Sequence, residues 1–182
     1  MSSPQSLSEA ERRLVATWAA DCAERVLPLF TVEAPDDDRA RDGITRARSF
    51  GHGERDTADE IRNRFVAGRA AQSARSPEAI AAARSAGQAS GVAHMAAHAL
   101  GAAAYAAKAA SLSANVQDAA RREEVRWQLA HMSDDVRGAL ARLPLLGENS
   151  SGPLGHGLLT SGALATTIRE IQQYISSDAT AT

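Results

Sequence analysis

The feature that most constrains this chain is an uncharged, alanine-rich stretch between Arg84 and Lys108. A helix of that length could cross the hydrocarbon core of a bilayer. However, the stretch has few large apolar side chains, and Gln88, His94 and His98 would be costly to place in lipid. We therefore predict a buried helix that other helices surround, and we expect no membrane partner.

One face of this predicted helix carries small residues, two histidines and a tyrosine. These residues recur at alternating spacings of four and three positions, which places them on the same side of a helix. Small residues let a neighbouring helix approach closely, and buried histidines need hydrogen-bond partners. We call this face the seam, and it consists of Gly87, Gly91, His94, His98, Gly101 and Tyr105.

The rest of the chain shows further helical patterns separated by capping and turn residues. Ser8 and Glu11 have the spacing of a capping box, and Pro28 predicts a kink or break of the first helix near Val26. No strand-like alternation is present. The expected fold is all-α, a single-domain helical bundle of about five to six helices with a long central alanine- and glycine-rich helix. After the first helix, the predicted helices span 36–51, 57–74, 77–111 and 118–143.

The two ends of the chain are expected to differ from the bundle. Glycine and serine dominate the segment after Pro144, which has no helical period and is interpreted as a loop. Apolar residues at helical spacing between Leu164 and Ile175 predict an amphipathic helix that either caps the bundle or forms a homodimer. The expected organisation is a disordered N-terminus at 1–7, a bundle domain at 8–143, a loop at 144–160, a C-terminal helix at 161–176 and a flexible tail at 177–182.

Charge and cysteine content exclude several classes of function. The formal net charge is -2, so no overall field would draw the chain onto nucleic acid, and no such partner is expected. A single cysteine, Cys22, excludes an internal disulfide, and its apolar helical position predicts a buried, unreactive thiol. No secretory signal pattern is present at the start, so the expected compartment is the cytoplasm. We interpret four arginines that lie among acids as part of a solvated helix face: Arg62, Arg64, Arg69 and Arg75.

The seam histidines raise the alternative of a metal site. His94 and His98 are four residues apart, and His131 and Asp134 could supply further ligands from the next helix. The sequence lacks the glutamate of an HExxH motif and the second acidic motif of a di-iron bundle. Structural or partner-facing histidines are therefore the preferred interpretation, and no cofactor is expected. A metal-binding helical-bundle enzyme that uses His94 and His98 stays open as an alternative.

The segments "SGVAHMAAHALGAAAYAAKAA" and "REEVRWQLAHMSDDVRGAL" resemble a bacterial family, common in actinobacteria, of immunity proteins of toxin systems. "CAERVLPLF" and "APDDDRARDGI" are similar to that family as well, and the resemblance covers about residues 8–142. It implies an all-helical domain that neutralises a cognate protein toxin by direct binding. It implies no catalytic residues, so a non-enzymatic role is preferred. Met132 and Ser133 stand where the family tends to have Leu-Pro, so the turn there is expected to differ.

An inhibitor that covers a toxin needs a rigid scaffold and a complementary charged patch. Helix capping and solvation are the simpler interpretation of each acidic cluster in this sequence. A small-molecule-binding helical protein, with a pocket beside Tyr105 and Trp127, is a further alternative. The candidate partner-facing residues are Asp36, Asp37, Asp38, Glu123, Glu124 and Asp135.

Overall fold

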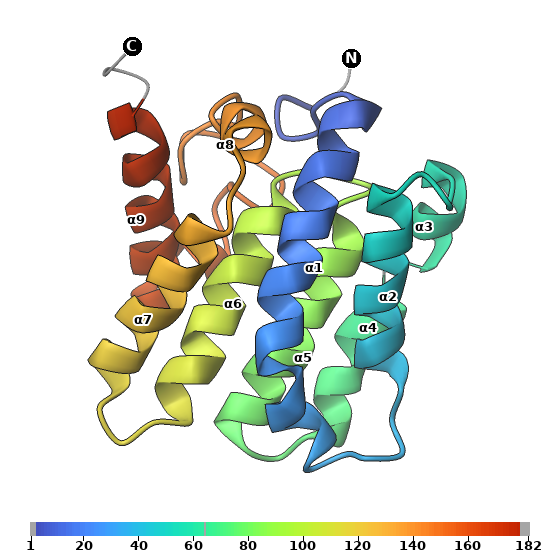
Figure 1. Ribbon diagram of the computed structural model, residues 1–182, viewed down its shortest axis with the longest axis vertical. Helices are drawn as coiled ribbons and strands as arrows, with labels where there is room; N and C mark the ends of the chain where they lie inside the picture. The colour runs from blue at the N-terminus through green and yellow to red at the C-terminus, as the bar shows by residue number, and fades with distance from the viewer. Residues whose placement is uncertain (1–2, 64, 179–182) are drawn as a thin grey trace.

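Helices α5 (Pro77–Gly91) and α6 (His98–Leu112) form the centre of the fold, and α1 (Glu9–Thr31) packs across both of them (Figure 1). This computed structural model describes residues 3–63 and 65–178, and within them the fold is all-α, as predicted. Almost every alanine of α5 and α6 is buried. Because alanine side chains are small, the helix axes can approach closely and fill the core at native density.

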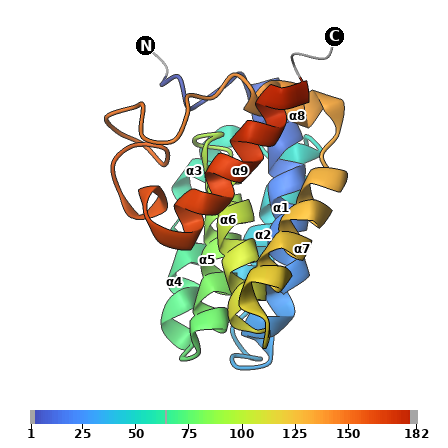
Figure 2. The same cartoon turned by 90° about the vertical axis from the view of Figure 1, so that its left-hand side faces the viewer.

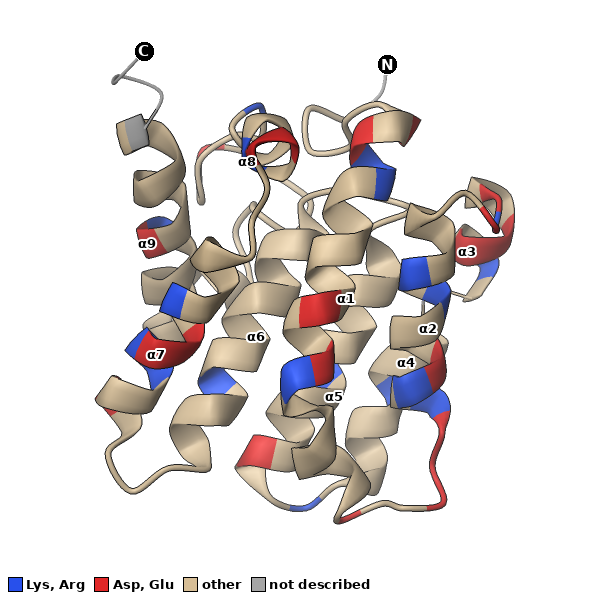
Figure 3. Cartoon of the chain, in the orientation of Figure 1, with Lys and Arg blue, Asp and Glu red and all other residues tan. Residues whose placement is uncertain are grey.

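The remaining elements surround this centre. Helix α2 flanks α1 and α5, while α7 lies on the other side against α6. Charged residues lie mainly on the outer helices, and α6 carries only Lys108 (Figure 3). The further elements are α2 (Arg39–Gly51), α3 (Thr57–Asn63), α4 (Val66–Arg69), a 3-10 turn (Ala70–Ser73), α7 (Gln117–Ala130), α8 (Asp134–Leu140), a second 3-10 turn (Leu158–Thr160) and α9 (Gly162–Asp178).

The single helix expected over 77–111 is corrected by the structure to two antiparallel helices. Residues 92–97 form successive turns that reverse the chain between α5 and α6. An unbroken helix over 77–111 would be about 52 Å long and would leave much of its alanine surface without a partner. Folding back lets α5 and α6 bury these surfaces on each other. No proline or capping residue in the sequence marks this reversal.

Two other predicted helix boundaries also change. Helix α1 continues through Pro28 to Thr31. The proline lies near the end of the helix and removes only one backbone hydrogen bond, so it does not end the helix there. The helix predicted over 118–143 is interrupted between α7 and α8. There the Ser133 hydroxyl accepts a hydrogen bond from the Val136 amide and starts α8 as its N-cap. This serine is where the sequence departs from the Leu-Pro of the resembling family.

Residues 3–7 were expected to be disordered, but the structure ties them to the bundle. Gln5 is buried, its Nε2 donates to the Ser151 carbonyl at 2.5 Å, and its Oε1 accepts from the Leu154 amide at 3.0 Å. The Gln5 carbonyl also accepts from the Ala97 amide. A single buried amide leaves no periodic signal, so the sequence could not indicate this contact. Residues 1–2, Arg64 and residues 179–182 lie outside the described part of the chain.

Helix α9 caps the bundle. Its apolar stripe, from Leu164 to Ile175, is buried, and the helix packs against α6, α7 and α8 (Figure 2). This stripe is therefore not available to a second copy of the chain. Across the helices that the structure describes, none has the combination of length and apolar character that a membrane span requires.

Candidate functional site

The seam residues face one another across α5 and α6. The His98 ring of α6 lies over Gly91 of α5, where an added Cβ would come within 3.0 Å of it. Likewise, the Gln88 side chain of α5 lies over Gly101 of α6, where a Cβ added to Gly101 would overlap the amide oxygen of Gln88. Nδ1 of His98 donates to Oε1 of Gln88 at 2.9 Å, since an amide oxygen can only accept. This reciprocal packing fixes the register of the two helices.

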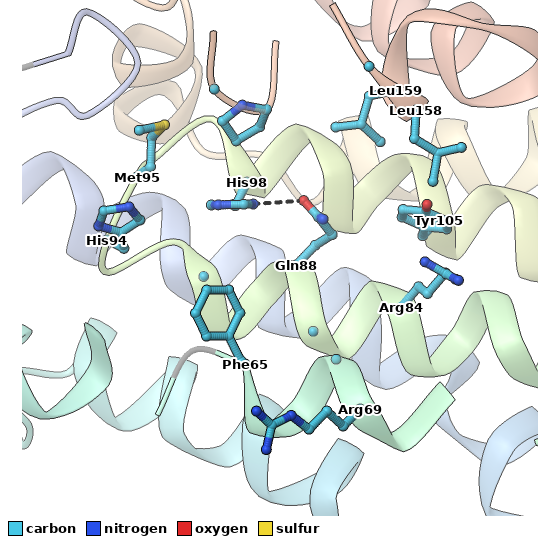
Figure 4. A pocket seen from close by; sticks show the side chains of 16 residues that line it. Phe65, Arg69, Arg84, Gln88, His94, Met95, His98, Tyr105, Leu158 and Leu159 are labelled. Carbon is cyan, nitrogen blue, oxygen red and sulfur yellow. Dashed lines mark hydrogen bonds between the residues drawn. The ribbon is translucent and has the colours of Figure 1, made fainter. Parts of the chain in front are cut away.

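A pocket of about 820 Å³ opens on this hydrogen-bonded pair (Figure 4). We call it the seam pocket. Its floor is formed by α5 and α6, one wall by α4, and its roof by the loop before α9. A Cβ on Gly87 would lie 2.8 Å from Cα of Gly68, so the wall at α4 and the floor at α5 are in backbone contact. The side chains that line it include Phe65, Arg69, Arg84, Tyr105, Leu158 and Leu159.

The charged groups that line the seam pocket are of one sign. Arg69 and Arg84 are exposed, and neither forms an ion pair with a carboxylate in the part of the chain that the structure describes. No described aspartate or glutamate lines the pocket, and His94 and His98 contribute further polar groups. The pocket is therefore locally positive although the chain has a net charge of -2.

Tyr105 lies at the same end of the pocket as Arg84 (Figure 4). Burial raises the pKa of its hydroxyl, and the Arg84 guanidinium, which hydrogen-bonds to it, acts in the opposite direction. The hydroxyl is therefore protonated at neutral pH. A guanidinium has five N–H groups, so Arg84 can hold Tyr105 and still present donors to a ligand.

The mouth of the pocket is apolar. Phe65 is 60% exposed and Leu158 is 63% exposed, although both are large hydrophobic side chains. Aromatic side chains beside arginines are typical of recognition surfaces. The seam pocket thus combines an apolar rim with positive charge and hydrogen-bond donors.

The four candidate metal ligands do not come together. His94 is exposed in the turn between α5 and α6. His131 stacks on Trp127 with ring centroids 4.0 Å apart, and its Nδ1 lies 2.8 Å from the Trp127 carbonyl oxygen. Asp134 is exposed and pairs with Arg137. Within the described residues, no three side chains of the types that bind metals form a group. This geometry gives no support to a metal centre built from His94, His98, His131 and Asp134.

Glu124, predicted to face a partner, lies inside the protein. Its side chain is 5% exposed and accepts from Arg25 Nε at 2.9 Å. Arg25 also stacks over the Trp127 ring at 4.0 Å, and Gln128 Nε2 lies 3.4 Å from the Glu124 carboxylate. Since a buried charge needs a partner, this ion pair between α1 and α7 explains the acid structurally. Helical period alone could not show that α1 would supply an arginine.

The other predicted partner-facing acids lie at separate places on the surface (Figure 3). Asp37 is 14% exposed, and hydrogen bonds from Arg39 hold the pKa of its carboxyl well below the usual value. Asp38 pairs with Arg41. Asp37 also accepts from the Arg39 amide at the start of α2, whereas Asp38, the N-cap residue, makes no side-chain capping hydrogen bond. Four of the predicted partner-facing acids are exposed: Asp36 and Asp38 on the α1–α2 connection, Glu123 on α7 and Asp135 on α8.

The sequence indicated the floor of the seam pocket but not its walls. Five of the six seam residues line it: Gly87, Gly91, His94, His98 and Tyr105. Arg69, interpreted from the sequence as part of a solvated face, also lines the pocket. Phe65 and the two leucines of the roof gave no signal for the pocket, because they come from segments distant in the sequence. Arg84 lies on α5 only three residues before Gly87, but it was not predicted as part of the seam. Trp127, expected near the pocket, is instead held by Arg25 and His131.

A protein-family model described as "Imm-5 like putative immunity protein" matches residues 5–135. No curated protein and no solved structure matches the chain. The matched region includes α1 to α7 and therefore the floor of the seam pocket and its α4 wall. The roof of the pocket and α9 lie beyond it.

Proposed function

Since the chain belongs to the Imm-5 like family of immunity proteins, we propose that it protects its cell by binding and neutralising a cognate protein toxin. The family match over residues 5–135 is the observation that carries this proposal. Neutralisation by direct binding requires no catalytic group, and the proposed site of action is the cytoplasm.

The bundle is suited to binding a partner without large rearrangement. Helices α1, α5 and α6 are held by a continuous core, and the Arg25–Glu124 pair links α1 to α7. A rigid scaffold lowers the entropic cost of association. The exposed Phe65 and the guanidinium of Arg84, which line the same pocket, are aromatic and arginine side chains of the kinds that dominate interface energy.

The test is co-expression with the candidate toxin encoded beside the gene for this chain. We expect cells that carry both to grow, and the two proteins to elute as one complex in size-exclusion chromatography. The matched control is an unrelated helical protein expressed at the same level. Growth arrest at full expression of the chain, together with separate elution of the two proteins, would refute neutralisation by binding.

A small-molecule-binding role is the second candidate, and the seam pocket favours it. Sites for small ligands are typically concave volumes of roughly 300–1,000 Å³ between helices, mostly apolar, with a few convergent polar groups. The seam pocket, at about 820 Å³, has this form. The metal-enzyme alternative has no comparable support, because its ligands lie apart.

A further inference from the structure

We propose that the seam pocket binds a small organic anion with a flat apolar body, of the aryl phosphate or aryl carboxylate class. The proposal rests on the second candidate function, and its test needs no toxin, so it can fail while toxin neutralisation stands. It follows from three properties of the pocket: its charge, the identity of its hydrogen-bond donors, and the apolar surface opposite them.

The charge of the pocket favours an anion. Arg69 and Arg84 are its only charged side chains other than histidine among the described lining residues, and both are positive. Many of the described arginines outside the pocket are neutralised in ion pairs, for example Arg46 with Glu60 and Arg48 with Asp21. An arginine that no carboxylate neutralises, in a concave site, attracts and concentrates anions. A guanidinium also matches the geometry of carboxylate and phosphate oxygens.

The hydrogen-bonding groups at the Arg84 and Gln88 end of the pocket floor are donors. Oε1 of Gln88 accepts from His98, so the remaining hydrogen-bonding group of this amide is its nitrogen, which can only donate. Arg84 lies on the same side of the pocket, beside Tyr105. Donors fixed before binding lose little entropy when an anion arrives. The head group of the ligand is therefore placed between Arg84 and Gln88.

The remaining surface accepts a flat apolar group. In Figure 4, Leu158 and Leu159 lie above Tyr105, and the Phe65 ring lies across the pocket from them. Phe65 and Leu158 are largely exposed, so a ligand that covered them would remove apolar area from water. An aromatic ring on the ligand could stack on Phe65. Glycines on the floor and roof leave the space between these side chains open.

The two leucines belong to the loop before α9, which lies outside the region that the family model matches. This loop is tied to the bundle through Gln5, whose amide bonds to Ser151 and Leu154. The leucines that contact the apolar body therefore come from the C-terminal segment of this chain, while Phe65 and the donors come from the matched region.

The test is isothermal titration calorimetry of the purified full chain with three probes. They are 1-naphthyl phosphate, which has both halves of the proposed ligand, 1-naphthol, and inorganic phosphate. We expect 1-naphthyl phosphate to bind with a Kd of about 0.1–1 mM at low salt, and each half-probe to bind at least about tenfold more weakly. Inorganic phosphate that bound as tightly would reduce the site to a simple anion site and overturn the proposal. Naphthol that bound as tightly would reduce it to an apolar patch, with the same consequence.

Substitutions localise the binding. Arg84→Gln is expected to weaken 1-naphthyl phosphate binding about tenfold, and Phe65→Ala about threefold. The matched control is Arg126→Gln, because Arg126 is an exposed arginine on α7 that forms no ion pair among the described residues. Its affinity should stay within twofold of the unmodified chain. If Arg84→Gln lowers the melting temperature, its weaker binding could reflect partial unfolding, and the affinity of Phe65→Ala then decides whether the pocket binds the ligand. Absence of saturable binding to 10 mM, or an equal loss in Arg126→Gln, would refute the proposal.

Discussion

Gly87 lies at a close backbone approach of α4 to α5, and alanine at this position should destabilise the fold. A Cβ there would lie 2.8 Å from Cα and 3.1 Å from N of Gly68. Both are backbone atoms, so no side-chain rotation can relieve the overlap, and α4 must move away from α5. The same movement would displace Phe65 and Arg69, which line the seam pocket.

The size of the effect follows from two opposing contributions. Glycine to alanine in a helix interior normally stabilises by roughly 0.5–1 kcal/mol. Overpacking a close contact typically costs about 1–3 kcal/mol. Gly138 in α8 provides the matched control, because a Cβ there meets nothing within 4 Å. Since the propensity gain is common to both positions, Gly87→Ala should be less stable than Gly138→Ala by about 1–3 kcal/mol.

The assay is urea unfolding of both variants and the unmodified chain, followed by circular dichroism and by the fluorescence of Trp18 and Trp127. Equal slopes of the unfolding free energy against urea would show that the midpoints can be compared directly. Gly138→Ala should unfold at higher urea than the unmodified chain, and Gly87→Ala at lower urea. If both variants were stabilised equally, the backbone contact between α4 and α5 would be refuted.

Three further predictions concern single groups. A double-mutant cycle with Gln88→Ala and His98→Ala should give a coupling of about 0.5–1.5 kcal/mol in urea unfolding, and strictly additive effects would contradict the hydrogen bond across the seam. Arg39 lowers the folded-state pKa of Asp37 below its unfolded value, so this carboxylate stabilises the fold above the unfolded pKa, and the contribution is lost as pH falls through the folded pKa. The stability of Asp37→Asn should therefore decline less steeply below about pH 4 than that of the unmodified chain, and parallel acid limbs would contradict this. Burial is the main reason that the pKa of the Cys22 thiol is raised, and nearby negative charge adds to it. Ellman's reagent should therefore label this buried thiol only as fast as the protein opens. Rapid labelling without denaturant would show that the thiol is not buried.

Features that depend on neighbouring residues could be predicted from the sequence. The capping box of Ser8 and Glu11 starts α1, and Ser76 with Pro77 starts α5, because each satisfies backbone donors within one turn. The stripe from Leu164 to Ile175 predicted the helix α9 with one apolar face, but it left open whether the bundle or a second copy of the chain would cover that face. In these cases the physical cause lies within about four residues, so the sequence alone determines the result.

The seam shows what the sequence could not determine. Its alternating spacing is the same whether residues 77–111 form one helix or fold back, so the period could not show the turn at 92–97. Packing decided it, because two antiparallel alanine-rich helices bury each other, with His98 over Gly91 and Gln88 over Gly101. Glu124 is buried for a similar reason, since Arg25, distant in sequence, reaches it from α1.

The sequence by itself therefore determined the all-α class, most helix starts and the small residues of the seam. Only the tertiary structure decided that these residues form the floor of a pocket rather than a filled contact. Helix α4 brings Phe65 and Arg69 to one side of that floor, and the loop before α9 brings Leu158 to another. Such contacts depend on the free energy of packing segments that are far apart in the chain. The spacing of residues within one helix does not depend on that free energy, so it cannot predict these contacts.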